Sequence, residues 1–410
     1  MGQVTDLDTF SALLAPEGQE LLAALRDHDP ADDLAAVTRL RRTHPAPLVS
    51  AALGQARLRQ RAAAKFGADA RRMYFTPNGV EQSTRATVAT HRAARLAALG
   101  VRTLADLCCG IGGDAIALAR AGVSVLAVDH DPLACAAARA NAEALGLADL
   151  IEVRCAEVTE VDTAGYDAVF VDPARRAGRG GPARGAGRIF DPEAYSPPLS
   201  WAVEAARTAP CAALKIAPGV PHEALPADAE TEWISDGGEV KEAVLWFGGP
   251  TDHTAAVVPG GRRATLLPGG AALLGAGLPD PEPGPVGGWL YEPDGAVIRA
   301  HLVADVAQRI DGRLIDPTIA YVTADRLTST PYATAYEITD VLPFNVKKLR
   351  ALLREREVGI AVIKKRGSAV SPEELRKKLK LGGGPHSCTI FLTRVAGAPT
   401  MLLGQPAAAA

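Results

Sequence analysis

A short apolar segment followed by a glycine-rich turn constrains the fold of this chain most strongly. Residues 101–107 (Val-Arg-Thr-Leu-Ala-Asp-Leu) have the composition of a buried strand, and Gly110, Gly112 and Gly113 follow without Cβ atoms. Residues 114–121 then predict a helix whose first N–H groups face the turn. This order of strand, turn and helix is typical of a ligand-binding corner in a doubly wound α/β sheet.

Two later strands are also predicted to end in carboxylates. Residues 124–129 end at Asp129, which is placed to accept hydrogen bonds from both hydroxyls of a ribose. Residues 168–172 end in Asp172, and Pro173 follows. Because the carboxyl ends of parallel strands lie at one edge of a sheet, these residues predict a site for a nucleoside-containing cofactor.

The glycine pattern alone leaves the cofactor open. Residues 110–115 fit the dinucleotide fingerprint G-x-G-x-x-A as well. Asp106, however, lies four residues before the first glycine, where a carboxylate would repel a pyrophosphate but bind an ammonium group. S-adenosylmethionine (SAM) carries an ammonium group and no phosphate. The acidic turn therefore favours SAM over NAD.

On these residues the chain resembles two known protein families. The ordered set Asp106, Gly110, Gly112, Asp129 and Asp172-Pro173 makes residues 100–250 similar to class I SAM-dependent methyltransferases. From about residue 289 onward, the chain resembles the THUMP-like C-terminal domain that is fused to such enzymes in bacteria. The second resemblance is carried by residues 340–350 (DVLPFNVKKLR), 363–367 (IKKRG) and 372–380 (PEELRKKLK).

The resemblance implies a doubly wound, Rossmann-like methyltransferase sheet with an N-terminal helical extension and a small α+β C-terminal domain. In the methyltransferase region, predicted strands alternate with predicted helices, which indicates parallel strands. Residues 81–99 predict one long helix that leads into the first strand. We expect four segments: an N-terminal helical region (1–99), a methyltransferase domain (100–267), a Pro/Gly-rich linker (268–288) and a basic THUMP-like domain (289–402).

The composition is that of a soluble, cytoplasmic protein. Hydrophobic residues make up 48% and charged residues 22% of the 410 residues. The first nine residues are polar and acidic, and no apolar stretch reaches the ~20 residues that a membrane span needs. The six cysteines form no C-x-x-C pair, so we expect buried, reduced thiols and no metal site.

The resemblance also assigns roles to residues of the cofactor site. Asp106 is expected to bind the methionyl ammonium group, directly or through water. The backbone around Gly110 and Gly112 is expected to approach the methionyl and ribose parts, and Asp129 to bind the ribose. Glu157 follows the third strand, where this fold contacts the adenine. The expected cofactor-binding residues are Asp106, Cys108, Gly110, Gly112, Asp114, Asp129 and Glu157.

The expected catalytic loop contains Asp172, Pro173 and Arg175. In similar amine-methylating enzymes, the acidic or amide residue at this position and the following carbonyl groups accept hydrogen bonds from an exocyclic NH2, which orients the nitrogen lone pair. Those enzymes carry an aromatic residue shortly after the proline, but Ala174 and Arg175 stand here. Arg175 either stacks on a base or grips a phosphate. Phe190 and Tyr195 are candidates for the missing aromatic side chain.

The same loop also resembles that of RNA 5-methyluridine methyltransferases, which act through a cysteine at the end of the next strand. Here Cys211 is predicted at the beginning of that strand, so covalent carbon methylation is disfavoured. Lys215, near the end of the same strand, is a candidate site residue. A salt bridge to Asp172 is its alternative role.

The C-terminal part of the chain is basic. Residues 341–400 contain 13 Lys and Arg against 4 Asp and Glu, whereas the whole chain has a net charge of −3. Such asymmetry indicates a polyanionic partner, and we expect RNA. The chain is thus predicted to methylate a base nitrogen of RNA. The alternatives are a non-catalytic RNA-binding protein with a vestigial methyltransferase fold and a small-molecule methyltransferase. The expected RNA-binding residues are Lys347, Lys348, Lys364, Lys365, Arg366, Lys377 and Lys378.

Overall fold

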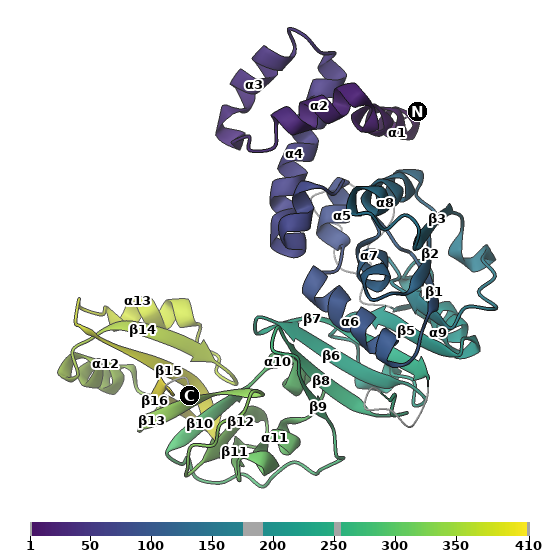
Figure 1. Ribbon diagram of the computed structural model, residues 1–410. Coiled ribbons are helices and arrows are strands. Elements are labelled where there is room, and N and C mark those ends of the chain that lie inside the picture. The colour runs from purple at the N-terminus through teal and green to yellow at the C-terminus, as the bar shows by residue number, and fades with distance from the viewer. Residues whose placement is uncertain (1, 175–191, 250–255, 408–410) are drawn as a thin grey trace. The chain divides into compact units, whose positions relative to one another are not determined.

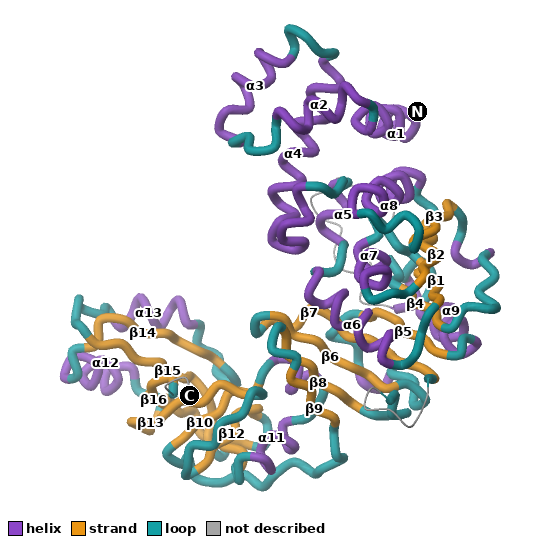
Figure 2. The backbone as a smooth tube through the Cα atoms, viewed as in Figure 1, coloured by secondary structure: helices purple, strands orange, loops and turns teal. Residues whose placement is uncertain are grey.

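The computed structural model describes residues 2–174, 192–249 and 256–407, and the chain divides into two compact units (Figures 1 and 2). The first unit comprises residues 1–230 and 243–260, and the second comprises residues 231–242 and 261–410. No helix among the described residues is long and apolar enough to cross a membrane.

The first unit contains the expected doubly wound sheet, with the strand order β3-β2-β1-β4-β5-β7. Its first five strands are parallel, and β7 pairs with β5 in the antiparallel direction. The strands are β1 (Thr103–Leu107), β2 (Ser124–Asp129), β3 (Ile151–Cys155), β4 (Ala168–Val171), β5 (Cys211–Ile216) and β7 (Glu239–Gly248).

The helices between these strands begin and end at residues suited to those positions. Pro132 is the first residue of α8, and the Leu133 N–H donates to the Asp131 side chain. Gly146 ends this helix with φ +73°. Three helices follow β1, β2 and β4 along the chain: α7 (Gly113–Arg120), α8 (Pro132–Leu145) and α9 (Leu199–Thr208). The helix predicted over residues 114–121 is α7, and its observed ends lie within one residue of the predicted ones.

The N-terminal region is helical, as predicted, but the single long helix expected over residues 81–99 is wrong. The structure has two helices there, and residues 83–85 separate them. The Gly79 N–H donates to the Thr76 side chain, which caps the first of the two at its N-terminus. The helices are α1 (Gly2–Leu14), α2 (Pro16–Ala24), α3 (Asp33–Leu40), α4 (Ala46–Phe66), α5 (Pro77–Gln82) and α6 (Ala86–Ala98).

The second unit contains β6 (Glu230–Asp236), β8 (Arg262–Leu267) and β9 (Ala271–Leu274) in the order β6-β8-β9. Strand β9 lies inside the segment expected to be a linker, because Pro268, Gly269 and Gly270 form the turn of a hairpin with β8. Gly270 has φ +72°, which glycine adopts without strain.

The second unit also contains a seven-stranded sheet with the order β11-β12-β10-β13-β16-β15-β14. Its strands are β10 (Trp289–Pro293), β11 (Arg313–Asp316), β12 (Ile319–Ala324), β13 (Ala333–Pro343), β14 (Val358–Lys365), β15 (His386–Val395) and β16 (Ala398–Pro406). Its helices are α10 (Gly295–Arg299), α11 (Val303–Arg309), α12 (Val346–Glu355) and α13 (Pro372–Leu379).

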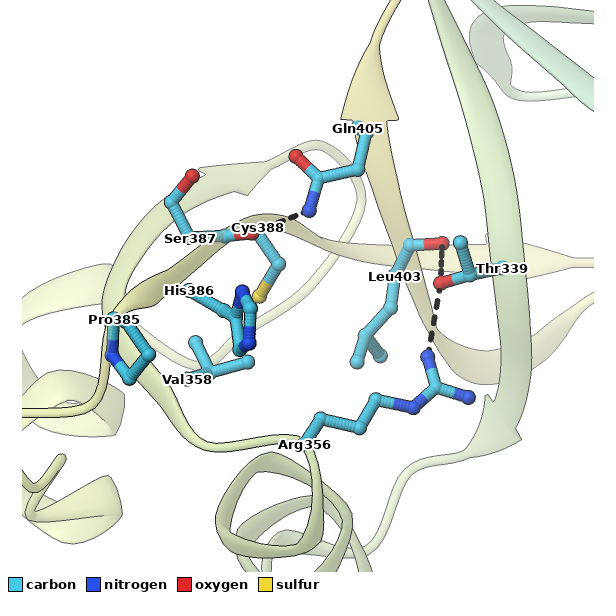
Figure 3. Close-up of a pocket in the computed structure, with 9 residues that line it drawn as sticks. All are labelled: Thr339, Arg356, Val358, Pro385, His386, Ser387, Cys388, Leu403 and Gln405. Atoms are coloured by element: carbon cyan, nitrogen blue, oxygen red, sulfur yellow. Dashed lines mark hydrogen bonds between the residues drawn. The ribbon is translucent and has the colours of Figure 1, made fainter.

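Helices α12 and α13 contact one another, and both pack on β14 (Figure 1). Leu349 and Leu353 of α12 and Leu375 and Leu379 of α13 are buried in one apolar core with residues of β14, β15 and β16. The lysines of these helices are consequently exposed. A pocket opens in the same sheet near the beginning of β15 (Figure 3).

One buried amide fixes the first unit's glycine-rich turn to two other segments. The Asn141 side chain of α8 accepts from the Tyr74 N–H at 2.6 Å and donates to the carbonyl oxygens of Tyr74 (3.0 Å) and Ile111 (2.9 Å). Asn141 is fully buried, so no water replaces these bonds.

We predict that Asn141→Ala lowers the free energy of unfolding by about 2–4 kcal/mol, because it leaves buried backbone groups without partners. Urea denaturation measures this loss. Glu143→Ala, an exposed position on the same helix, is the control and should change stability by less than about 0.5 kcal/mol. Equal effects of the two substitutions would contradict the role of Asn141.

Candidate functional site

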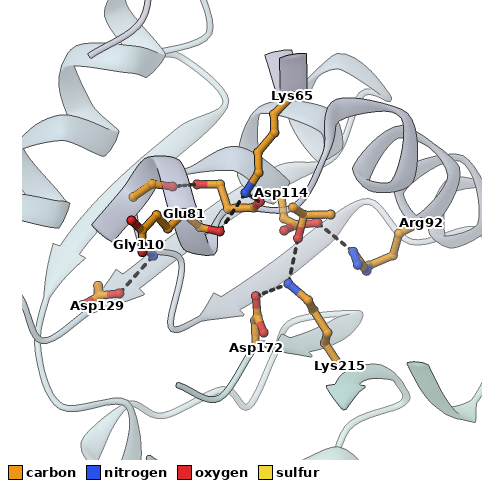
Figure 4. A network of polar contacts seen from close by, with 11 residues as sticks. Lys65, Glu81, Arg92, Gly110, Asp114, Asp129, Asp172 and Lys215 are labelled. Carbon is orange, nitrogen blue, oxygen red and sulfur yellow. Dashed lines mark hydrogen bonds and ion pairs between the residues drawn. The ribbon is translucent and has the colours of Figure 1, made fainter. Parts of the chain in front are cut away.

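Three of the predicted acidic residues meet at one edge of the first unit's sheet. Strand β1 lies between β2 and β4, so Asp106, Asp129 and Asp172 come from neighbouring strand ends. The Asp172 N–H donates to the Leu107 carbonyl oxygen at 3.2 Å, which continues the pairing of β4 with β1. Figure 4 shows Asp129 and Asp172 together with Gly110 of the glycine-rich turn.

The carboxylate of Asp129 anchors the glycine-rich turn. Its Oδ2 accepts from the Gly110 N–H and its Oδ1 from the Asp131 N–H, both at 2.9 Å. Gly110 has φ +55° and open space where a Cβ would lie, whereas a Cβ on Gly112 (φ +83°) would lie 3.4 Å from that of Ala138. Each carboxylate oxygen retains a second lone pair, which is what ribose hydroxyls need.

Asp106 is the carboxyl group that most clearly needs a further partner. It is fully buried, and neither of its oxygens has a hydrogen-bond partner among the described residues. Burial, reinforced by the nearby carboxylates of Asp114 and Asp172, raises its pKa well above the ordinary value. A cationic ligand group would satisfy this carboxyl group, so the residues present fit the ammonium group of SAM.

Cys108 and Glu157 line a pocket beside this edge. Cys108 adopts φ +70°, and burial raises the pKa of its thiol well above the ordinary value. Ser196 reaches the pocket because its backbone pairs with that of Ala174 in a short β-bridge. The lining consists of Cys108, His130, Glu157, Val158, Thr159, Ser196 and Pro197. The pocket thus joins the segments that follow β1, β2 and β3, where the adenine of SAM is expected.

Asp114 has a partner within the protein. Its carboxylate accepts from Arg92 Nη1 of α6 at 2.7 Å, and both side chains are nearly inaccessible (Figure 4). The Arg92 guanidinium also lies 4.5 Å from the centre of the Phe170 ring. Asp114 therefore ties the beginning of α7 to α6, a contact that the sequence did not indicate.

Asp172 is held by a lysine from the next strand. Lys215 Nζ lies 2.6 Å from Asp172 Oδ2 and 2.9 Å from Thr84 Oγ1, and the lysine is buried (Figure 4). Of the two roles considered for Lys215, the salt bridge is the one observed. Thr84 lies in the break between α5 and α6. Because the sequence predicted a continuous helix there, the contact of Thr84 with Lys215 was not expected.

A second lysine secures that break. Lys65 Nζ donates to the carbonyl oxygens of Glu81 and Ser83, each at 2.8 Å. A Cβ added to Gly79 would lie 2.6 Å from the Ile111 side chain, so this segment packs directly on the glycine-rich turn. The N-terminal region thus contributes to the site.

The rest of the predicted catalytic loop is only partly described. Pro173 is buried, and Tyr195, one candidate aromatic residue, is buried as well. Arg175 and Phe190 lie outside the described residues. Cys211 is at the beginning of β5, as expected, and burial raises the pKa of its thiol to about 11.

The predicted RNA-binding cations fall into two groups. Lys364 pairs with Glu292 and lies near the Tyr336 ring, and Arg366 lies 4.0 Å from Glu292 and 4.9 Å from the Tyr321 ring. These two side chains stabilise the sheet. The others are exposed and form no ion pair within the described parts of the chain: Lys347, Lys348, Lys365, Lys377 and Lys378.

Comparisons with known proteins identify families that this chain is similar to. A family model described as RNA cap guanine-N2 methyltransferase matches residues 101–190, and a THUMP domain-like model matches residues 333–406. Residues 6–62 match a domain of unknown function. An uncharacterized S-adenosylmethionine-dependent methyltransferase of Mycobacterium tuberculosis is 35% identical over 348 residues, which span 82% of this chain and 90% of the relative.

Among solved structures, a candidate methyltransferase from Porphyromonas gingivalis shares the fold of this chain. The match has a TM-score of 0.71 and 22% sequence identity, and it covers 93% of this chain and 99% of the other.

We predict that Asp129→Ala weakens SAM binding about 5- to 150-fold, since it removes the acceptor for the ribose and the anchor of Gly110. Titration calorimetry measures this change. Asp149→Ala, at an exposed position, should leave the affinity unchanged. An unaltered dissociation constant for the Asp129 variant would refute the ribose assignment.

Asp106 predicts a pH dependence of SAM binding. Because its pKa is raised, it retains a proton to higher pH than an ordinary aspartate, and binding an ammonium group favours the ionised form. Affinity should therefore rise as pH increases through this pKa, with release of a proton on binding.

Calorimetry in buffers of different ionisation enthalpy counts that proton, and Asp106→Asn should abolish its release. Proton release that persists in the Asp106 variant would assign the effect to another group.

Proposed function

Because the chain belongs to the S-adenosylmethionine-dependent methyltransferases, we propose that it transfers the methyl group to a base nitrogen of RNA. SAM is its cofactor and supplies an electrophilic methyl group on a sulfonium. The remaining question is which nucleophile the protein presents to that group, and the loop after β4 (Ala168–Val171) bears most directly on it.

The observation that carries this proposal is the anchored carboxylate of Asp172. Lys215 engages Oδ2, and Thr84 holds Lys215 from the other side, so the carboxylate has a fixed orientation. The other oxygen of Asp172 remains as an acceptor for an exocyclic NH2. Such a bond orients the nitrogen lone pair toward the methyl group, and the reaction then needs little acid–base chemistry.

The cofactor side of the site follows from the same edge of the sheet. Asp129 would bind the ribose, Asp106 the methionyl ammonium group, and Glu157 the adenine edge. We assign the backbone around Cys108, Gly110 and Gly112 to the methionyl and ribose portions. Asp114 contributes indirectly, because its ion pair with Arg92 fixes the beginning of α7.

Two observations support RNA as the acceptor. The models that match residues 101–190 and 333–406 describe an RNA cap guanine-N2 methyltransferase and a THUMP-like domain. Independently, α12 and α13 expose Lys347, Lys348, Lys377 and Lys378 without ion-pair partners in the described structure. Unpaired cations are available for phosphates, whereas Lys364 and Arg366 already share Glu292.

Carbon methylation through a cysteine is disfavoured. Such an enzyme needs a thiolate beside the acceptor, but Cys211 lies at the opposite end of β5 (Cys211–Ile216) from Lys215. Burial keeps its thiol protonated at neutral pH, since its pKa is raised to about 11. We therefore assign nitrogen as the acceptor atom.

The direct test is incubation with methyl-labelled SAM and either total RNA or total protein, followed by nucleoside analysis. We expect label in a nitrogen-methylated nucleoside. Asp172→Ala, which removes the acceptor, should reduce the turnover number at least about 100-fold while SAM affinity stays nearly constant. Asp149→Ala serves as the control. Label in protein alone would replace RNA by a protein acceptor, and loss of SAM binding in the Asp172 variant would show that the loop is misassigned.

The exposed lysines predict the salt dependence of RNA binding. If they contact phosphates of single-stranded RNA, log K should fall with log salt at a slope of about −0.7 per phosphate neutralised. Replacing Lys347, Lys348, Lys377 and Lys378 by Glu should flatten that slope and raise KM for RNA without changing SAM affinity. The four Arg replacements, which keep the charge, should retain the slope. A slope unaffected by the Glu replacements would mean that this surface does not bind RNA.

A further inference from the structure

The C-terminal sheet contains a pocket of about 390 Å³ to which no role has been assigned. Its volume is in the range of small-ligand sites and is sufficient for a nucleobase. The lining residues come from β13, the connection after α12, the first residue of β14, the segment that leads into β15, the beginning of β15 and the end of β16 (Figure 3): Thr339, Arg356, Val358, Pro385, His386, Ser387, Cys388, Leu403 and Gln405.

Two glycines next to the lining residues Val358 and Pro385 hold the segments that carry them together. A Cβ on Gly359 would lie 2.1 Å from the Gly384 carbonyl oxygen, and one on Gly384 would lie 1.9 Å from that of Glu357. Only glycine permits this close approach, which places the beginning of β14 against the segment before β15. The His386 N–H donates to the Glu357 carbonyl oxygen at 3.3 Å and completes the junction.

The pocket has an apolar floor and a polar rim. Val358, Cys388 and Leu403 are buried and form the floor. His386 and Gln405 are exposed on the rim. Gln405 Nε2 donates to the Ser387 carbonyl oxygen, which leaves its Oε1 as an acceptor. This combination suits a flat heterocycle with donors and acceptors along its edge.

Arg356 adds a fixed planar surface. Its guanidinium donates to both carboxylate oxygens of Asp340, and its Nη1 also donates to Thr339 Oγ1 at 3.2 Å (Figure 3). The carboxylate neutralises the charge of Arg356, so the side chain is poorly suited to hold a phosphate. Its plane is nevertheless oriented in advance, and guanidinium planes stack on bases.

We propose that this pocket binds one unpaired base of an RNA strand. Arg356 directly follows the C-terminal end of α12 (Val346–Glu355), and the first turn of the same helix exposes Lys347 and Lys348, roughly 12 Å away at 1.5 Å per residue. The lysines bind phosphates, while His386 and Gln405 contact the base. This proposal rests on the proposed function only because RNA supplies the base. The pocket would give the C-terminal domain a preference for single-stranded segments of RNA.

The test compares fluorescent RNA probes of about 12 adenosines, cytidines or uridines with an abasic strand of equal length. The abasic strand keeps the phosphates but lacks the bases. The variant is His386→Ala combined with Gln405→Ala in the full-length protein. The control is Gln308→Ala, which removes an exposed amide elsewhere in the same unit. Equal melting temperatures of the three proteins establish that they are folded.

We expect wild type and control to bind at least one base-containing probe more tightly than the abasic strand. The double variant should lose about 5- to 100-fold in affinity for that probe. Its affinity for the abasic strand and the slope of log K against log salt should not change, because no phosphate contact is removed.

Two results would overturn the proposal: unchanged binding of every base-containing probe by the double variant, or an equal loss on the abasic strand. The assay involves no methyl transfer. If total RNA accepts no label but the base preference is found, then the proposed function fails while the pocket assignment stands.

Discussion

The concentration of carboxyl groups at one edge of a buried sheet is the constraint on which the first unit depends. Asp106, Asp114, Asp129 and Asp172 lie close enough for Asp114 and Asp172 to raise the pKa of Asp106. Two buried cations, Arg92 and Lys215, each pair with one of these carboxylates. Removing either cation would leave a buried negative charge uncompensated. The cluster of carboxylates therefore depends on the cation that β5 supplies and on the cation that α6 supplies. Helix α6 precedes the alternating strands and helices of the sheet.

This dependence gives the N-terminal helices a part in the site. Thr84 contacts Lys215, and Arg92 pairs with Asp114. Lys65 donates to the backbone carbonyl oxygens of Glu81 and Ser83. The same region is fixed from the other direction by Asn141, which binds the backbone of Tyr74. The orientation of the Asp172 side chain therefore depends on residues that precede the first strand of the sheet in the sequence.

Local patterns predicted much of this structure, and long-range contacts account for what they missed. Strand β2 matches its predicted bounds, and helix α7 lies within one residue of its predicted ends, because a short apolar segment and a glycine-rich turn are local signals. The Lys364–Glu292 pair joins residues 72 positions apart, and Lys215 meets Thr84 across 131 positions. No short sequence window contains such information. Strand β9 was missed because the prolines and glycines around it were read as a linker and not as a hairpin turn.

The way the chain is shared between the two units has consequences for how they can be separated. The boundaries at residues 230/231, 242/243 and 260/261 mean that the backbone passes between the units three times. A single proteolytic cut at any one of these points does not separate the two units cleanly, because at least one of the two fragments still contains residues of both units. Simple truncation is no better, because ending the chain at residue 260 would keep β6 but remove its partner β8. The second unit is therefore interwoven with the first in sequence, and a variant that contains all of it must keep residues 231–242 together with residues 261–410.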